Sequence, residues 1–370
     1  EIPLRLVGSE MCIRDSYFMD EIFYDVVDLL KALISTPSVS REEQAAADII
    51  ENFLKARGCT TQRCGNNVWT IASGYSHERP TLLLNSHIDT VRPVDGWTRN
   101  PFSPDDDGER IYGLGSNDAG ASVVSLTAAF LLLSQRQQRY NLVFLASCEE
   151  EVSGKGGIEA VLPLLPKIDV ALVGEPTGMH PAVAEKGLMV LDGEIAGKSG
   201  HAARDEGENA IYKALPMIER LRSLSFPLTS AHLGPVKISV TQISAGTQHN
   251  VVPDMCRIVV DVRTTDAYTN EQTLEMIRQA VPFCKLTPRS VRLRPSGISE
   301  QHPIVRRLVI AGRKPFGSPT LSDQALMPFP SLKIGPGDSA RSHTADEYIT
   351  YDEIREAIQI YFTTLDGLAL

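Results

Sequence analysis

The chain has 370 residues, 42% of them hydrophobic and 22% charged, which is the composition of a soluble globular protein. Its length exceeds one ordinary domain, so we expect two. The net charge of −10 without basic clusters argues against nucleic acid or an anionic membrane surface as a partner, and no apolar run approaches the roughly 20 residues that cross a bilayer.

The first 18 residues lack the long apolar stretch and small-residue cleavage site of a signal peptide. The segment "VGSEMCIRDS" looks like a translated sequencing adaptor. We therefore expect residues 1–18 to be a non-native or disordered leader. Six scattered cysteines without a C-x-x-C pair predict free thiols in a reducing compartment. Together these features predict a cytoplasmic protein.

Apolar residues recur at helical spacing from Met19 to Ile34, and Pro37 ends the predicted helix. Ser40 with Glu43 predicts a capping box that opens a second helix, which Gly58 closes.

Short apolar strands follow, and a long apolar helix, residues 121–135, lies between the middle two of them. The predicted strands are 68–71, 81–84, 142–146 and 170–173. Strands that alternate with helices predict an α/β fold with a mainly parallel sheet flanked by helices.

The pattern changes near Glu185, where a block of about a hundred residues suits a small α+β domain inserted into the first. Its predicted strands are 187–195, 236–243 and 256–264, and its predicted helices lie near 208–224 and 270–282. We expect a catalytic domain formed by 19–184 and 294–370, with "SLKIGPG" as a late strand and turn, and an inserted domain formed by 185–293.

Histidines and acids stand just after the predicted strands of the large domain, or in glycine-rich turns. They are His87, Asp89, Asp118, Glu149, Glu150, Glu151, Glu175 and His343. In open α/β sheets ligands bind beyond the carboxyl ends of the strands, so these groups should converge. Histidines with carboxylates are ligands for zinc or a similar divalent ion. Taken singly, each residue also suits a core histidine, a turn or a solvated acidic segment.

Several segments, in order, give the chain its resemblance to a known family. They are "LLLNSHIDTV", "GLGSNDAG", "FLASCEEEVSGKGG", "VGEPT", "GKSGHAA", "HNVVPD", "DVRTT" and "GPGDSARSHTADEY". From about residue 19 to its end the chain resembles the M20 family of metal-dependent amidohydrolases and peptidases. The resemblance implies a zinc-peptidase-like catalytic domain and an inserted dimerisation, or lid, domain.

The resemblance implies two divalent metal ions per chain, zinc or cobalt. His87 and Glu175 would hold one ion, Glu151 and His343 the other, and Asp118 would bridge both. The bridging aspartate of the family precedes a cis peptide bond, so we expect the bond from Asp118 to Ala119 to be cis.

The resemblance also implies catalytic roles. Asp89 would orient His87, and Glu150 would be the general base if the acidic triplet aligns without a gap. Glu149 stands where the family usually has aspartate, so a shift by one place, with Glu149 as base and Glu150 as ligand, stays open.

Three residues of the inserted domain match further family positions. His201 would reach the active site of the partner subunit in a homodimer as an oxyanion donor. Asn250 would lie near the substrate, and Arg263 would bind its α-carboxylate. Local alternatives are a loop histidine, a turn before Pro253 and an ion pair with Asp261.

Within the family, "GPGDSARSHTADEY" and "VGEPTG" are most similar to the acetylornithine deacetylase group. This likeness implies removal of the acyl group from N-acetylornithine or N-acetylcitrulline in arginine biosynthesis. Succinyl-diaminopimelate desuccinylase, a dipeptidase or carboxypeptidase, and a non-catalytic metal-binding dimer remain alternatives.

Overall fold

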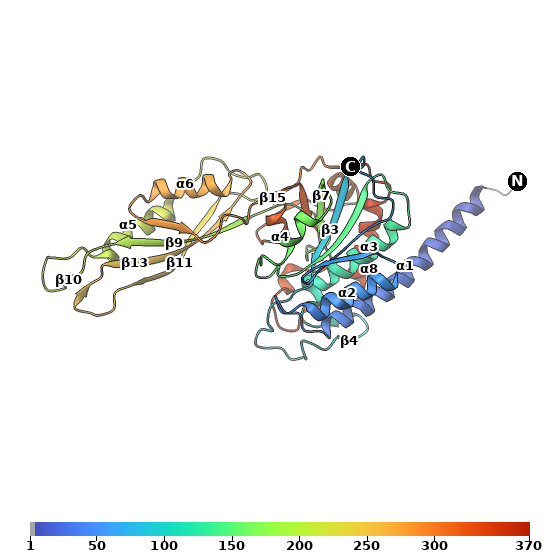
Figure 1. Ribbon diagram of the computed structural model, residues 1–370, viewed down its shortest axis with the longest axis horizontal. Coiled ribbons are helices and arrows are strands. Elements are labelled where there is room, and N and C mark those ends of the chain that lie inside the picture. Colours follow the sequence, from blue (N-terminus) through green and yellow to red (C-terminus); the bar gives the residue numbers. More distant parts are fainter. Residues whose placement is uncertain (1–3) are drawn as a thin grey trace. The chain divides into compact units, whose positions relative to one another are not determined.

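The computed structural model describes the backbone of residues 4–370 and the side chains of residues 19–370. The chain forms two compact units (Figure 1). The first unit comprises Glu1–Val183, Ile298–Phe316 and Ser322–Leu370, and the second comprises Ala184–Gly297 and Gly317–Leu321.

A mixed sheet forms the centre of the first unit, in the order β1-β2-β6-β3-β7-β17-β8. Its strands are β1 (Thr61–Cys64), β2 (Asn67–Ile71), β6 (Asn141–Ser147), β3 (Thr81–His87), β7 (Val170–Val173), β17 (Ser331–Lys333) and β8 (Ala182–Glu185). The four central strands β6, β3, β7 and β17 are parallel, and the flanking strands pair antiparallel. The carboxyl ends of the four parallel strands therefore meet at one edge.

Helices cover both faces of this sheet. One face packs on α1 (Leu4–Ile34), α2 (Gln44–Ala56), α3 (Ala121–Ser134), α7 (Pro303–Ile310) and α8 (Tyr351–Leu365), and the other on α4 (Ile158–Val161) and two 3-10 turns, Leu162–Leu164 and Asp323–Leu326. Side chains alternate along β3, so Leu82 and Leu84 enter the first core and Leu83 the second. Strands buried on both faces explain the continuous apolar runs, and the predicted α/β class is confirmed.

Helix α3 is apolar all round because it lies inside the first unit, where residues 121–133 are all buried. By length and composition alone, Ser116–Ser134 is the one helical segment of the described residues that could cross a bilayer, but 89% of an 18-residue stretch of it is buried in the fold. Its hydropathy is that of a core helix.

The start of the chain differs from the sequence prediction. Helix α1 begins at Leu4 rather than near Met19. Residues 1–3 lie outside the described residues, as do the side chains of 4–18, so the leader at residues 1–18 stays a prediction. Cys59, Cys64, Cys148, Cys256 and Cys284 are free thiols, as expected.

The predicted capping box at Ser40 is wrong. Helix α2 begins at Gln44, its N-cap residue is Glu43, and no side chain caps it. The hydroxyl of Ser40 donates instead to Oδ2 of Asp89 at 2.7 Å. A buried carboxylate needs donors more than a solvated helix end does, because an unsatisfied buried charge is costly.

The second unit contains an antiparallel sheet in the order β11-β13-β9-β14. Its strands are β11 (Lys237–Ala245), β13 (Met255–Thr264), β9 (Gly187–Ala196) and β14 (Lys285–Pro288). Helices α5 (Ala210–Ser223) and α6 (Asn270–Ala280) share one hydrophobic core with its inward side chains. The alternating pattern of β9 and β13 therefore buries one face of the sheet and leaves the other polar.

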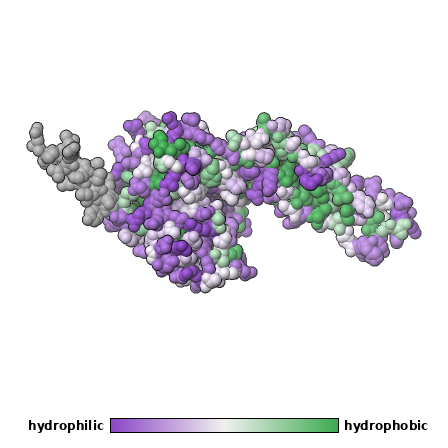
Figure 2. All heavy atoms as spheres, turned by 180° about the vertical axis from the view of Figure 1, so that it is seen from behind, coloured by the Kyte–Doolittle hydropathy of each residue, from purple (hydrophilic) through white to green (hydrophobic). Residues whose placement is uncertain are grey.

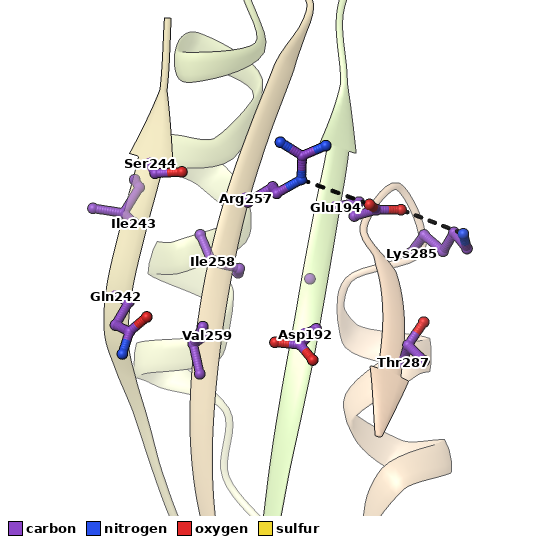
Figure 3. A pocket seen from close by; sticks show the side chains of 11 residues that line it. Asp192, Glu194, Gln242, Ile243, Ser244, Arg257, Ile258, Val259, Lys285 and Thr287 are labelled. Atoms are coloured by element: carbon purple, nitrogen blue, oxygen red, sulfur yellow. Dashed lines mark hydrogen bonds and ion pairs between the residues drawn. The ribbon is translucent and has the colours of Figure 1, made fainter. Parts of the chain in front are cut away.

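The polar face of this sheet carries ion pairs between neighbouring strands. Glu194 of β9 lies between Arg257 of β13 and Lys285 of β14, with nitrogen–oxygen distances of 3.8 and 3.3 Å (Figure 3). Such exposed pairs contribute little to stability, about 0–1 kcal/mol each. The face is thus held by the core beneath it rather than by its own ion pairs.

The remaining elements are short. They are β10 (Gly200–His201) with β12 (Val251–Val252), β15 (Ser296–Gly297) and β16 (Phe316–Ser318) beside β8, the three-stranded sheet β18 (Tyr348–Thr350), β5 (Arg110–Tyr112) and β4 (Asp105–Asp106), and the turns Ser116–Gly120 and Ser339–Arg341.

Candidate metal centre

Five predicted ligands lie together at the carboxyl edge of the central strands. His87 ends β3, and Glu151, Glu175 and His343 follow β6, β7 and β17. Asp118 lies in the turn before α3, in the segment Ser116–Gly120. The sheet order β6-β3-β7-β17 brings residues from four separate parts of the sequence to one place.

The carboxylate of Asp118 divides this cluster into two halves. Its Oδ1 lies 3.3 Å from Nε2 of His87, which in turn lies 3.7 Å from Oε1 of Glu175. Its Oδ2 lies 3.8 Å from Nε2 of His343, which lies 3.0 Å from Oε2 of Glu151. Each half thus contains one histidine, one glutamate and one oxygen of the shared aspartate.

The donor set suits divalent cations. One ligand atom each of His87, Asp118 and Glu151 lies within 4.8 Å of the others. Imidazole nitrogens and carboxylate oxygens are ligands of zinc and related ions. Three carboxylates this close repel one another unless positive charge lies between them.

Asp89 supports the cluster in two ways. Nδ1 of His87 lies 2.9 Å from the Asp89 carbonyl and 3.4 Å from its carboxylate Oδ1. Because both oxygens only accept, Nδ1 carries the proton and Nε2 faces the cluster. The same carboxylate accepts the backbone N–H groups of Glu150 and Glu151 at 3.0 and 3.1 Å. The sequence predicts the first role, and the second is apparent only in the structure.

The first acid of the triplet points away from the cluster. Glu149 has a positive φ of 56°, and its carboxylate accepts the N–H of Gly156 at 3.3 Å. A Cβ at Gly154 or Gly156 would collide with this carboxylate. The glycines of "SGKGG" therefore make room for the side chain of Glu149, which packs against this loop.

Glu151, the third acid, faces the cluster through its contact with His343. Glu150, the second acid, stands between Glu149 and Glu151 in the sequence. Glu150 is partly buried, and its backbone is fixed by Asp89. The contact of Glu151 with His343 agrees with the ungapped alignment for Glu151, and the role of Glu150 as base stays a prediction.

Burial and close contacts shift the pKa values of several groups of the cluster. Burial raises the pKa of Glu150 well above its ordinary value, and burial likewise raises the pKa of Glu175 to about 8. The hydrogen bond to Glu151 raises the pKa of His343 to about 9. Bound cations would compete with protons for Glu175 and His343, since ligands must lose their protons to coordinate.

The bond from Asp118 to Ala119 is cis, as expected. Glu347, which is 2% exposed, holds the turn that precedes this cis bond. Its carboxylate accepts the backbone N–H groups of Gly115, Asn117 and Asp118 at 3.1, 2.9 and 2.8 Å. Glu347 stands only four residues after His343, but no local pattern predicts its contacts with this turn.

The buried contacts of two further acids were not predicted either. Asp323 accepts from the hydroxyl of Ser147 at 2.6 Å and from Nδ2 of Asn85 at 2.9 Å, and so joins the ends of β6 and β3. Glu43 accepts the N–H of Glu149 at 3.2 Å and Nδ2 of Asn66 at 2.8 Å. The partners of both acids are distant in sequence, so no local spacing signals them.

His201, Asn250 and Arg263 belong to the second unit, whereas the five ligands belong to the first. His201 is exposed on β10, and the N–H of Ala202 donates to the carbonyl of Asn250 at 2.9 Å. Arg263 pairs with Asp261 at 2.9 and 3.2 Å, so the local alternative of an ion pair is present. The structure brings His201 and Asn250 close to each other.

Comparison with known proteins is consistent with this site. Residues 83–367 match peptidase family M20/M25/M40. Acetylornithine deacetylase from Klebsiella pneumoniae is 27% identical, with 87% of this chain and 92% of that protein covered. Succinyl-diaminopimelate desuccinylase from Dinoroseobacter shibae is 30% identical, with 69% and 72% covered.

Solved structures share the fold at low sequence identity. Aminopeptidase PepT from Bacillus cereus superposes with a TM-score of 0.75 at 18% identity, covering 93% of this chain and 98% of that one. YXEP from Bacillus subtilis, described as a dinuclear metal-binding peptidase of the M20 family, has a TM-score of 0.72 at 17% identity, with 94% and 98% covered. With its motif segments, sheet and ligand cluster, the chain belongs to peptidase family M20/M25/M40 and is a metal-dependent hydrolase of amide bonds.

Proposed function

We propose that this enzyme uses two divalent cations, zinc or alternatively cobalt, to remove the acyl group from an N-acylated amino acid. The observation that carries the proposal is the division of the cluster by Asp118 into two halves of like composition. His87 and Glu175 would hold one cation, and Glu151 and His343 the other. Four cationic charges would face three ligating carboxylates, which relieves their repulsion.

Bound cations of this kind polarise a scissile carbonyl and make a water molecule acidic near neutral pH. Glu150 then has the proton-transfer role. Its carboxylate takes a proton from the attacking water and gives it to the nitrogen of the departing amine. Burial raises the pKa of Glu150 above its ordinary value, which favours the protonated form that must donate to the amine.

Asp89 would hold His87 and the turn with Glu150 and Glu151 in place. It fixes the tautomer of His87 and, through two backbone N–H groups, the turn that carries Glu150 and Glu151. A movement of this carboxylate would therefore disturb a ligand and the base together.

The second unit would contribute substrate contacts. We assign His201 as a donor to the oxyanion in the partner's site, and Asn250 as a contact to the substrate. Arg263 would bind the α-carboxylate of the substrate, because its planar fork fits a carboxylate with two hydrogen bonds. For this it would leave Asp261 or share its donors with it.

For the substrate we favour N-acetylornithine, with N-acetylcitrulline next, which places the enzyme in arginine biosynthesis. The relative from Klebsiella pneumoniae, covered along most of its length, supports this choice, as do "VGEPTG" and "GPGDSARSHTADEY". We assign the enzyme to the cytoplasm, in keeping with its free cysteines. Succinyl-diaminopimelate and simple dipeptides are the competing substrates.

A substrate panel tests this choice directly. The metal-loaded enzyme should hydrolyse N-acetylornithine or N-acetylcitrulline with a higher kcat/KM than N-succinyl-diaminopimelate or dipeptides, measured by amine release. A dipeptide as the fastest substrate would overturn the choice and favour a peptidase. No hydrolysis of any member, with cations bound, would favour a binding protein.

We further propose that the enzyme is a homodimer joined through the second unit. Strand β11 is the outer strand of its sheet, paired on one side only among the described residues. An open strand edge is a template for pairing with a second chain. Beside it, α5 exposes Tyr212 and Leu215, which are 71% and 57% exposed. Figure 2 also shows hydrophobic residues on the surface of this unit.

Replacing Leu215 by glutamate is expected to convert the dimer into a monomer, because a charge would be buried without a partner. Light scattering after size-exclusion chromatography measures the mass. The matched control is Ile310→Glu on α7 of the first unit, where the side chain is 83% exposed; it should leave the mass unchanged. A Leu215→Glu protein that keeps the dimer mass would exclude α5 from the interface.

A further inference from the structure

We infer that Asn117 is a positioning residue that presets His343 for the cation shared with Glu151. The inference rests on the proposed two-cation function and deepens it. It implies that one of the two cation sites depends on Asn117 and that the other does not.

His343 is the ligand whose position most needs an explanation. Its side chain is 50% exposed, compared with 2–12% for His87, Asp118, Glu151 and Glu175. It has a positive φ of 58° and lies between a short 3-10 turn, Ser339–Arg341, and β18. Among the described residues, its ring contacts the carboxylates of Glu151 and Asp118, and other groups must place its backbone.

The side chain of Asn117 is hydrogen-bonded to the segment just before His343. Its Oδ1 accepts the N–H of Asp338 at 3.0 Å, and its Nδ2 donates to the carbonyl of Asp338 at 3.1 Å. Nδ2 also lies 3.4 Å from the hydroxyl of Ser342. Both ends of the amide therefore bind a segment that ends one residue before the ligand.

The contact requires a close approach of the backbone. Asn117 is fully buried, and Gly337 beside it has a φ of 86°. A Cβ at Gly337 would collide with Oδ1 of Asn117. The residues before His343 are thus built around the amide group.

A second set of hydrogen bonds holds the residues just after His343. The carboxylate of Glu347 accepts the backbone N–H groups of Asn117 and Asp118. The segment 338–347 is therefore fastened to the Asp118 turn on both sides of His343, by the side chain of Asn117 on one side and by its backbone on the other.

A simple turn-forming role does not account for Asn117. An asparagine that forms a turn bonds to its own backbone two residues on, whereas this amide bonds to residues 221 and 225 positions away. Its hydrogen bonds hold together two segments that are distant in sequence, one with Asp118 and one with His343.

The two halves of the centre should respond differently when Asn117 is changed. His87 ends β3 and Glu175 follows β7 in the hydrogen-bonded sheet, so the bonds of Asn117 do not hold them. The position of His343 instead depends on the hydrogen bonds between Asn117 and Asp338. A ligand that is not held in place must be ordered when the cation binds, and this ordering weakens affinity. Outer contacts of this kind change metal affinity by about 10–100-fold.

The test is calorimetric titration of metal-free wild type and Asn117→Ala with zinc or cobalt. In the variant, the first equivalent should bind as in wild type and the second about 10–100-fold more weakly. Hydrolysis should fall at stoichiometric metal and return with excess metal, with KM unchanged. A loss of folding alone would weaken both equivalents and would not be restored by metal.

Asp346→Asn is the matched control, because Asp346 lies in the same segment but accepts from Thr98 and Arg99 rather than holding the Asp118 turn. It should bind both equivalents as wild type does. If Asn117→Ala does not fold, Gly337→Ala attacks the same contact from the other segment and should give the same result.

The outcomes separate the two levels of the proposal. Wild type that fails to bind two cations contradicts the proposed function itself. Wild type that binds two, with Asn117→Ala binding both equally well or both equally poorly, overturns only the role of Asn117.

Discussion

Replacing Glu150 by glutamine is expected to lower kcat by about 10²–10⁴-fold, the usual contribution of a general acid–base group. KM and metal content should stay near their wild-type values, because Glu150 is not among the five residues of the two halves. Steady-state kinetics together with metal analysis of the same samples measures both. An effect on kcat alone identifies a group that acts in the transition state.

Glu149→Gln is the control for that variant. The glutamine can still accept the N–H of Gly156 within the glycine-lined loop, so kcat should change little. If instead Glu149→Gln loses activity and Glu150→Gln loses a cation, the triplet is shifted by one place and the assignment of base and ligand is wrong.

Removing the cations with a chelator is expected to abolish hydrolysis and to destabilise the first unit strongly. A cation present at 100 times its Kd stabilises by about 2.7 kcal/mol, so two sites together contribute about 5 kcal/mol. For a unit of this size such a change lowers the melting temperature by about 10–20 °C. Scanning calorimetry with and without chelator measures the shift.

The physical reason is charge repulsion among buried acids. Asp118, Glu151 and Glu175 converge with two histidines, and bound cations would relieve the repulsion among their carboxylates. Readdition of metal should restore both activity and melting temperature. A chelated protein that melts at the same temperature would contradict a cation-filled cluster.

The sequence predicts the convergence of four of the five expected ligands because each stands at or after the end of a predicted strand. The run "TLLLN" is continuous and apolar, as expected for a strand buried on both faces, and His87 ends that strand. The carboxyl-edge rule then brings His87, Glu175 and His343 to one edge without knowledge of the strand order. The motif resemblance adds Asp118, whose glycine-rich turn has no such signal.

Contacts between distant segments could not be predicted. Ser40 next to Glu43 has the spacing of a capping box, but its hydroxyl bonds to Asp89, 49 residues away. Glu347 reaches back 229–232 residues to the Asp118 turn. Local spacing carries no information about such partners, because they are set by tertiary packing.

The roles within the acidic triplet also needed the fold. Three adjacent glutamates have equal propensities, and only the positive φ of Glu149, its glycine-lined loop and the approach of Glu151 to His343 distinguish them. The resemblance therefore predicts that one acid is a base and one a ligand; the contact of Glu151 with His343 favours Glu151 as the ligand, and Glu150 as the base stays a prediction.

The most direct measurement is a crystal structure of the zinc-loaded enzyme with anomalous scattering at the zinc edge. It should show two peaks about 3.5–4 Å apart, the usual spacing in two-metal sites. One peak should contact His87 and Glu175, the other Glu151 and His343, with one oxygen of Asp118 on each. Zinc bound elsewhere, or a fully loaded protein with one peak in this cluster, would contradict the two-cation centre.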